Sequence, residues 1–401
     1  MSVTERDFII IGGGIIGLVL GYKVKMRYPN KTVLVIEKEQ NSVCHGTGRN
    51  SGVIHSGIYY PPETLRAKYC VSGSKQLKNY VIKRNLWIDQ CGKILLPTSK
   101  KTVESIPLLL ERANQNGVEA SLMNGAELRA MEPNCHPLFD LGVHVPFTSV
   151  VDPKEVAGSI LADLLELDGE ILYGHKVTQA NAESGAVVAG GRQFIGRVVI
   201  NAAGLHADKI AGLAGLVSRY SFLPFKGKYW RLDSSIKMRK LVYPIPNLEL
   251  PFLGVHTAHN RAGDVYLGPS STPVFGRENY HALAGLQAQE ALSLMVSFSK
   301  KILFNVNGLR TLGLRELRLL LPKGIQREAN LLLKPSLSNK LSIAPDKVGI
   351  RSQIFDDENN HLLNDFVIQK QARIIHILNA ISPAFTASFG LADRLLERYI
   401  E

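Results

Sequence analysis

The sequence predicts an α/β fold in which a discontinuous Rossmann-like domain holds an inserted α+β domain with an antiparallel sheet. Three apolar runs are typical of buried parallel strands, namely residues 7–11, 197–204 and 373–379, and they lie far apart in the chain. The segments between them are rich in strand and turn signals. A parallel-sheet domain interrupted by a second domain accounts for this order.

The size and composition of the chain fit this division. Its 401 residues suit two interleaved domains, and 45% hydrophobic with 20% charged residues is ordinary for a globular protein. We expect residues 1–80, 151–220 and 341–401 to form the Rossmann-like domain. Residues 81–150 and 221–340 are expected to form the inserted substrate domain.

Several classes of protein are disfavoured by the sequence. No apolar stretch approaches the roughly 20 residues of a spanning helix, and residues 1–20 lack the pattern of a signal peptide. The four cysteines are scattered without a CxxC pair, which predicts neither a metal site nor a disulfide framework. These features predict a cytoplasmic protein.

The net charge of +12 leaves three kinds of partner open: nucleic acid, an anionic membrane surface and a small acidic substrate. Nucleic-acid binding is not predicted, because the basic residues are dispersed rather than clustered with aromatic residues. The densest basic run, 310–334, lies among leucines. It is typical of helices that lie on an anionic bilayer, and equally of a solvated face over a local core.

Residues 7–37 predict one strand–helix–strand unit, with a helix over 15–28 and a second strand over 32–37. The glycines at its first turn fit the G-x-G-x-x-G pattern: one permits the turn, one lets the backbone approach a pyrophosphate, and one lets the helix pack closely. Glu37 follows about 20 residues on, where a carboxylate accepts ribose hydroxyls and disfavours a 2′-phosphate. The predicted dinucleotide contacts are Gly12, Gly14, Ile15, Ile16, Gly17, Glu37 and Lys38.

The polar segment 46–60 is the most unusual in the chain, with four glycines, hydroxyls, an Asn, an Arg and a His. It has two interpretations. As a cofactor loop, it would offer backbone N–H groups to a pyrophosphate and flavin and place His55 near the ring. As a surface loop, it would carry a capping His.

The chain resembles the D-amino-acid-oxidase-type FAD superfamily, and within it the L-2-hydroxyglutarate oxidase/dehydrogenase group. The resemblance runs nearly end to end. Its motifs are Gly12–Gly17, Glu37–Glu39, Asn50–Tyr60, Cys91–Lys93, Asn201–Gly204, Pro224–Gly227, Tyr243–Pro246, Pro251–His256, Gly268–Pro269, Gly349–Arg351 and Ser382–Ala384. It implies FAD as cofactor, a small anionic 2-hydroxy acid as substrate, and re-oxidation by oxygen or a membrane quinone.

Oxidation of a 2-hydroxy acid needs a base for the hydroxyl proton and cations for the carboxylates. His55 and His256 are the candidates for the base, and which of them acts stays open. Arg351 and Lys226 are the candidate carboxylate clamps. Arg277 is a weaker third clamp, and Tyr243 is interpreted either as a pocket residue or as a buried structural tyrosine.

The resemblance also implies further cofactor contacts. A helix after the 379–384 segment is expected to point its N-terminus at the flavin pyrimidine, where the positive end of the helix dipole would stabilise negative charge. The remaining predicted contacts are Thr47, Arg49, Asn50, Ser51, Gly52, Val177, Ala203, Gly204, Arg351, Ser382, Pro383 and Ala384.

Three departures from the group pattern carry their own expectations. Arg49 replaces a His used by related enzymes for covalent attachment, so FAD is expected to be non-covalent. Lys226 replaces an Arg, and Ile381 and Phe385 add bulk near the expected flavin. Two other functions therefore remain open: an amine or amino-acid oxidase of the same superfamily, and a non-catalytic FAD-binding assembly protein. Besides the cytoplasm, a peripheral position on the inner face of a membrane is a second candidate location.

Overall fold

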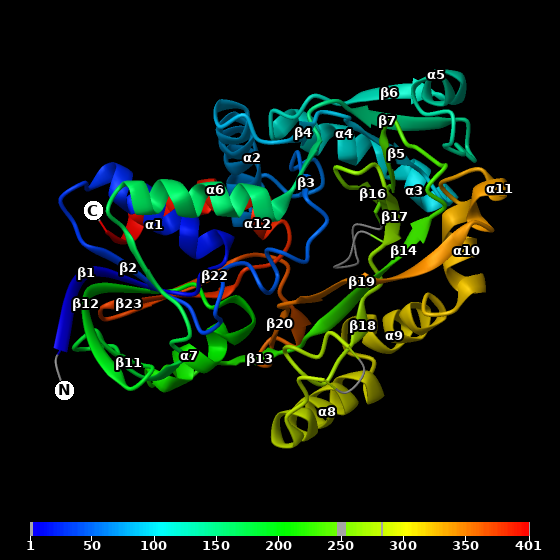
Figure 1. The fold of residues 1–401 in the computed structure, drawn as a ribbon. Coiled ribbons are helices and arrows are strands. Elements are labelled where there is room, and N and C mark those ends of the chain that lie inside the picture. Colours follow the sequence, from blue (N-terminus) through cyan, green and yellow to red (C-terminus); the bar gives the residue numbers. More distant parts are fainter. Residues whose placement is uncertain (1–2, 247–253, 282–283, 401) are drawn as a thin grey trace.

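The computed structural model describes residues 3–246, 254–281 and 284–400. Two domains lie side by side (Figure 1). One holds both termini, and its blue, green and red segments show that distant parts of the chain build it. The predicted α/β fold with a discontinuous first domain is confirmed.

The first domain is built on an eight-stranded sheet. Its central strand β1 (Val3–Ile11) lies parallel to both β2 (Val33–Ile36) and β12 (Arg192–Asn201), and β12 is parallel to β23 (Ile374–Asn379). These are the three predicted buried runs together with the second strand of the first unit. The other strands are β9 (Glu170–Leu172), β10 (Val177–Asn181), β11 (Ala186–Ala189) and β22 (Val367–Gln371).

Helices cover both faces of this sheet. α1 (Ile15–Arg27), α6 (Pro153–Glu166) and α12 (Ala384–Tyr399) lie on one face, with α2 (Leu65–Lys83) packed on α12, and α7 (Ala207–Leu213) lies on the other (Figure 1). α2 begins where the Thr64 hydroxyl accepts a hydrogen bond from Ala67 N at 3.1 Å. The Asp365 carboxylate also accepts from Leu65 N and Arg66 N at 2.9 and 2.7 Å, which joins the start of α2 to the C-terminal part of the chain.

The second domain contains two larger sheets. The five-stranded sheet is antiparallel and is formed by β16 (His256–His259), β17 (Val265–Gly268), β14 (Phe225–Leu232), β18 (Thr272–Pro273) and β19 (Leu341–Arg351). The four-stranded sheet is formed by β15 (Leu241–Pro244), β5 (Lys93–Leu96), β7 (Leu141–Val145) and β6 (Ser121–Asn124). The predicted antiparallel character holds except for one pair, since β15 and β5 run parallel.

Helices surround these sheets on the outside of the molecule (Figure 1). The helices that follow β18 lie near the five-stranded sheet (Figure 1), and residues 310–334 fall within two of these helices and the segments that follow them. The helices of this domain are α3 (Lys100–Glu104), α4 (Ile106–Gln115), α5 (Gly125–Met131), α8 (Ala288–Leu303), α9 (Leu309–Arg318), α10 (Pro322–Asn330) and α11 (Pro335–Ser338).

Two three-stranded sheets lie where the domains meet. They are formed by β3 (Val53–Ile54), β8 (Ser149–Val151) and β4 (Ile88–Asp89), and by β13 (Tyr220–Phe222), β20 (Ile354–Asp356) and β21 (His361–Leu362). The structure differs here from the expected range 341–401. β19 pairs along β14, and β20 pairs with β13. The sequence could not place these strands, because a strand pattern shows that a strand exists but not which partner it takes.

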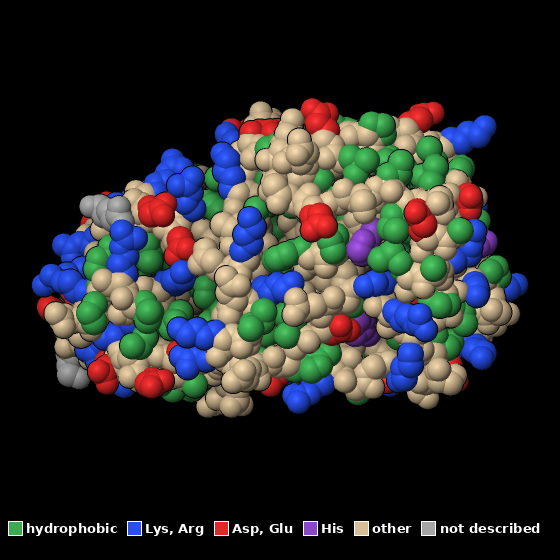
Figure 2. All heavy atoms as spheres, turned by 90° about the horizontal axis from the view of Figure 1, so that it is seen from above, with side chains coloured by type: hydrophobic (Ala, Val, Ile, Leu, Met, Phe, Trp, Pro, Cys, Tyr) green, Lys and Arg blue, Asp and Glu red, His purple; other side chains and the backbone are tan. Residues whose placement is uncertain are grey.

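Residues 251–253 of the Pro251–His256 motif lie outside the described residues. None of the described helices is long and apolar enough to cross a bilayer. On the face shown in Figure 2, Lys and Arg side chains are spread among Asp and Glu side chains.

Candidate active site

The glycine turn between β1 and α1 has the geometry that its pattern predicts. Gly12 has φ +115°, and a Cβ there would lie 2.6 Å from the Ala202 carbonyl oxygen. A Cβ on Gly17 would lie 2.0 Å from the Gly12 carbonyl oxygen. Any larger residue would therefore separate α1 from the strand end, and the N-terminus of α1 would lose its position beside the turn.

Glu37 and Thr47 complete a cradle around this helix end. The buried Glu37 carboxylate accepts hydrogen bonds from Gly13 N at 2.7 Å and from Glu39 N at 2.9 Å. The Thr47 hydroxyl accepts from Ile15 N at 2.9 Å, so the 46–52 loop closes over the start of α1. A carboxylate oxygen has further lone pairs, which leaves Glu37 able to accept from a ribose hydroxyl.

One cavity of about 610 Å³ runs from this cradle into the second domain. Most predicted site residues line it. Those that do are Gly12, Gly14, Ile15, Ile16, Glu37, Lys38, Thr47, Arg49, Asn50, Ser51, His55, Val177, Ala203, Gly204, His256, Arg351, Ser382, Pro383 and Ala384.

Gly17 and Gly52 do not line the cavity but shape its wall. Gly52 has φ +75°, and a Cβ there would lie 2.3 Å from the Val151 carbonyl oxygen. Ile381 and Phe385 line the cavity, as their predicted proximity to the flavin required, and both side chains are buried.

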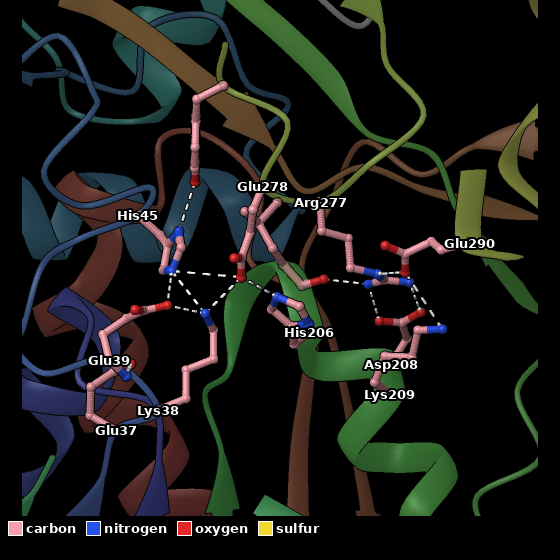
Figure 3. Close-up of polar contacts among 12 residues, drawn as sticks. Glu37, Lys38, Glu39, His45, His206, Asp208, Lys209, Arg277, Glu278 and Glu290 are labelled. Atoms are coloured by element: carbon pink, nitrogen blue, oxygen red, sulfur yellow. Dashed lines mark hydrogen bonds and ion pairs between the residues drawn. The ribbon is translucent and has the colours of Figure 1, made fainter. Parts of the chain in front are cut away.

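A charged network closes the ribose end of the cavity (Figure 3). Lys38 Nζ lies 2.7 Å from a Glu278 carboxylate oxygen and contacts Glu39. His206 Nε2 lies 2.8 Å from Glu278, and His45 Nε2 lies 2.9 Å from Glu39. The hydrogen bond with His206, and next the bond from Lys38, hold the pKa of Glu278 well below its usual value against the effect of burial.

Arg351 is a cation in the part of the cavity wall that the five-stranded sheet provides. It ends β19, is partly buried, and donates from Nη1 to the Ser271 hydroxyl at 3.0 Å. Ser271 N in turn donates to the Glu316 carboxylate of α9. Burial lowers the pKa of Arg351, but a guanidinium keeps its charge in proteins. Arg351 therefore presents to the cavity a positive charge that is oriented by its hydrogen bond to Ser271.

His256 has a defined tautomer. Its Nδ1 lies 2.8 Å from the Gly254 carbonyl oxygen. A carbonyl only accepts, so Nδ1 carries the hydrogen and Nε2 keeps a free lone pair. Burial, and to a smaller extent the charges of Arg351 and Lys93, lower the pKa of His256 to about 3, although the bond to Gly254 opposes them.

His55 is also neutral, for similar reasons. Burial, then the charges of Lys93, His256 and Arg66, hold its pKa well below the ordinary value. Its backbone N donates to the Thr386 hydroxyl at 3.1 Å, and its Nδ1 has no hydrogen-bond partner in the described part of the chain. The tautomer of His55 is thus not determined by a neighbour, unlike that of His256.

Sequence reasoning missed three residues that line the substrate end: Arg66, Tyr229 and Thr386. Arg66 donates from Nε to the Ser382 carbonyl oxygen at 2.8 Å and stacks its guanidinium 4.4 Å from the Tyr60 ring centroid. Tyr229 follows from strand alternation, because the cavity-lining residues of β14 are Gly227 and Tyr229, two positions apart.

The same alternation corrects the prediction for Lys226. This residue is not among those lining the cavity, and its Nζ donates to the Asn279 side-chain oxygen at 3.0 Å. Arg277 also lies outside the lining. Its guanidinium binds both Asp208 oxygens, at 2.5 and 2.8 Å, and its Nε lies 2.7 Å from Glu290 (Figure 3). Both cations are already satisfied by the protein, so neither is a carboxylate clamp.

The sequence drew attention to Lys93 only as part of the Cys91–Lys93 motif, but the structure buries its side chain completely. Its side chain is 0% exposed, and its Nζ has no hydrogen-bond partner among the described residues. The contacts of Nζ are with the rings of Tyr59 and Tyr243, at 4.3 and 5.5 Å from their centroids. Such contacts stabilise a cation by about 0.5–2 kcal/mol, while burying an ion costs several kcal/mol. Accordingly, burial lowers the pKa of Lys93 to about 7.

Comparison with known proteins identifies the family of the chain. A family model described as FAD-dependent oxidoreductase, DAO, matches residues 7–398. The chain belongs to the DAO family.

Three curated relatives of this DAO-family chain are named L-2-hydroxyglutarate dehydrogenase. The L-2-hydroxyglutarate dehydrogenase of Escherichia coli K12 is 33% identical, covering 98% of this chain and 92% of its own. The enzyme of that name from Indibacter alkaliphilus is 34% identical, covering 98% of both chains. The human mitochondrial enzyme is 30% identical, covering 99% and 90%.

Solved structures share the fold of this DAO-family chain. L-α-glycerophosphate oxidase from Mycoplasma pneumoniae, with FAD bound, superposes with a TM-score of 0.77 at 19% identity over 99% of this chain and 94% of its own. L-proline dehydrogenase from P. horikoshii gives a TM-score of 0.70 at 15% identity over 100% and 95%. At these identities the likeness concerns the fold alone.

The residues present fit the FAD of the DAO family. The glycine turn leaves room for backbone to approach a diphosphate, Glu37 retains acceptor capacity, and the N-terminus of α12 at Ala384 borders the far end of the cavity. Arg49 lies in the wall, where its guanidinium is 3.8 Å from the Tyr280 ring centroid. An arginine offers no imidazole for attachment at this position.

Proposed function

We propose that this protein oxidises L-2-hydroxyglutarate to 2-oxoglutarate. The observation that carries the proposal is that a held cation, Arg351, and a neutral imidazole with a free Nε2, His256, border one cavity that continues from the dinucleotide cradle. The name shared by the curated relatives supports the substrate.

Each group has a separate task in this reaction. Arg351 binds the carboxylate next to the reacting carbon, since a guanidinium forks onto a carboxylate through two N–H groups. His256 Nε2 accepts the hydroxyl proton, because its Nδ1–H is held by Gly254. Of the two candidates, His256 is therefore the proposed base, and His55 orients the substrate.

FAD, when bound, accepts the hydride from the substrate carbon. The first domain is proposed to hold it without a covalent bond, through the glycine turn, Glu37 and the 46–52 loop. The positive N-terminal end of α12 favours negative charge at the other end of the cavity.

The substrate proposal is tested by turnover. Purified protein with L-2-hydroxyglutarate and an artificial electron acceptor should form 2-oxoglutarate in proportion to acceptor reduced. The D-enantiomer and L-lactate are the controls for stereochemistry and for the second carboxylate. Equal or faster turnover of a D-amino acid would instead assign the protein to amine oxidation.

We also propose that α8 and α9 contact an anionic membrane surface, where electrons can pass to a quinone. Apolar side chains with 47–76% exposure lie on these adjacent helices and just beyond their C-terminal ends, interspersed with basic residues. This α8–α9 surface comprises Leu292, Met295, Val296, Lys300, Leu303, Phe304, Arg310, Leu314, Leu317, Arg318 and Leu321. Apolar and basic groups together are what an anionic bilayer surface attracts.

Charge reversal on this surface should release the protein from anionic vesicles. Each Lys or Arg near such a surface contributes about 1 kcal/mol, so R310E/R318E should weaken binding by about 30-fold or more. Cosedimentation with phosphatidylglycerol vesicles measures this. K68E/K75E carries the same charge change on α2 and is the matched control. Equal binding of both variants and the wild type would reject the α8–α9 surface as the membrane contact.

A further inference from the structure

We propose that Lys93, with the hydroxyls of Tyr59 and Tyr243, is the binding site for the second carboxylate of a dicarboxylate substrate. This inference rests on the proposed function and names the group that would distinguish 2-hydroxyglutarate from 2-hydroxy acids with an apolar chain. Lys226 and Arg277 were expected to bind substrate carboxylates, but both are bound by other side chains of the protein. Another cation is therefore needed for the second carboxylate.

Lys93 lies directly behind the wall that carries the histidines. The rings of Tyr243 and His256 stack with centroids 4.0 Å apart and planes inclined by 20°. Lys93 Nζ contacts the Tyr243 ring, and β5, which carries Lys93, pairs with β15, which carries Tyr243. His256 lines the cavity, so the rings of Tyr243 and His256 lie between the ammonium and the space where substrate is proposed to bind.

The groups around Lys93 share an unusual property. Lys93 Nζ and the hydroxyls of Tyr59 and Tyr243 are buried, and all three lack hydrogen-bond partners in the part of the chain that the structure describes. Buried polar groups in proteins are nearly always hydrogen-bonded, so several orphans in one place need an explanation. A carboxylate is a suitable partner for each of them, because it accepts from an ammonium and from hydroxyls alike.

Among the described residues, no carboxylate pairs with Lys93. Cys70 is the one acid group that raises the pKa of Lys93, and burial raises the pKa of that thiol to about 12, so it stays neutral. The Lys93 ammonium is therefore buried without an anionic partner among the described residues. A structural lysine would be expected to have such an anion or to extend to solvent.

Occupation of this site requires a side-chain movement, because Lys93 is fully buried in the structure. The side chains that separate it from the cavity include the Tyr243 and His256 rings. Rotamer changes of this kind are common on ligand binding. The proposal is thus that the Tyr243 ring shifts so that the distal carboxylate meets the ammonium, while His256 keeps its bond to Gly254.

The test compares two substrates in three variants. The measured quantity is the ratio of kcat/KM for L-2-hydroxyglutarate to kcat/KM for L-2-hydroxybutyrate, which lacks the second carboxylate. K93M keeps the volume of the side chain and should lower this ratio by about 100-fold, as expected for loss of one partner of a buried charge pair. Y243F should lower it by about tenfold, through loss of one hydrogen bond to a charged group. K83M, on the exposed end of α2, is the matched control and should leave the ratio unchanged.

The pH dependence gives a second readout. Burial lowers the pKa of Lys93 to about 7, so the free protein loses this charge as pH rises through that value. The kcat/KM for L-2-hydroxyglutarate should then fall above about pH 7 in the wild type. The same limb should be absent for L-2-hydroxybutyrate and absent in K93M.

The outcomes separate this inference from the proposed function. A wild type that prefers L-2-hydroxyglutarate, with the preference retained in folded, FAD-loaded K93M and in Y243F, overturns the Lys93 site alone. A wild type that does not oxidise L-2-hydroxyglutarate overturns the proposed function and the site with it. If K93M does not fold, Y243F and the wild-type pH profiles still decide the question.

Discussion

Replacing Arg351 with Met should lower kcat/KM for L-2-hydroxyglutarate by about 10³, because loss of one partner of a buried charge pair costs roughly 2–5 kcal/mol. Arg351 is the held cation at the substrate end of the cavity, and its hydrogen bond to Ser271 aims the guanidinium. Initial rates over a range of substrate concentrations measure the effect. KM is expected to carry most of it, since a carboxylate clamp binds substrate before reaction.

Two further variants serve as controls for R351M. R351K retains the charge but loses the planar fork, so its defect should be intermediate. R129M removes an exposed arginine of α5 that pairs with Asp140, and it should behave as wild type. If R351M keeps FAD and also keeps kcat/KM within a few-fold of wild type, Arg351 does not bind the substrate.

Replacing His256 with Ala should slow reduction of the bound flavin by about 10² or more, the usual contribution of a general base. The proposed base is the Nε2 atom, left free because Nδ1 donates to Gly254. Rapid-mixing measurements of the flavin reduction rate test this directly. H259A is the matched control, because His259 lies on the same strand, pairs with Asp89 and does not line the cavity.

The pH profile of the wild type gives the sign of this effect. The neutral imidazole is the active form, so activity is lost as pH falls through the pKa of His256 in the free protein. Burial, with Arg351 and Lys93, lowers that pKa to about 3. The acid limb of kcat/KM should therefore lie well below pH 6.5. An acid limb that disappears in H55A but persists in H256A would make His55 the base.

The cofactor half of the site could be predicted from the sequence because its constraints are local. Gly12, Gly14, Gly17 and Glu37 are close in the chain, and the turn and helix end that they form follow from backbone sterics. The discontinuous sheet was predictable for a related reason, since buried parallel strands are apolar throughout.

The residues of the proposed substrate half could not be predicted, because their positions depend on strand pairing and ion pairs between distant parts of the chain. Lys226 and Arg277 had the right chemistry, but strand alternation in β14 and the carboxylates of Asp208 and Glu290 take them out of the cavity. Lys93 had no local signal of function. Its burial exists only because β5 packs beside β15 and against Tyr59.

The central claim is that substrate oxidation at this site is specific for L-2-hydroxyglutarate. Anaerobic mixing of FAD-loaded protein with L-2-hydroxyglutarate, its D-enantiomer, L-lactate, L-malate, glycerol 3-phosphate and D-amino acids tests it most directly, with the visible flavin absorbance as the readout. The account predicts fast loss of this absorbance with L-2-hydroxyglutarate and slow or no loss with the others. Fast loss with an amino acid, or no loss with any of these compounds, would contradict it.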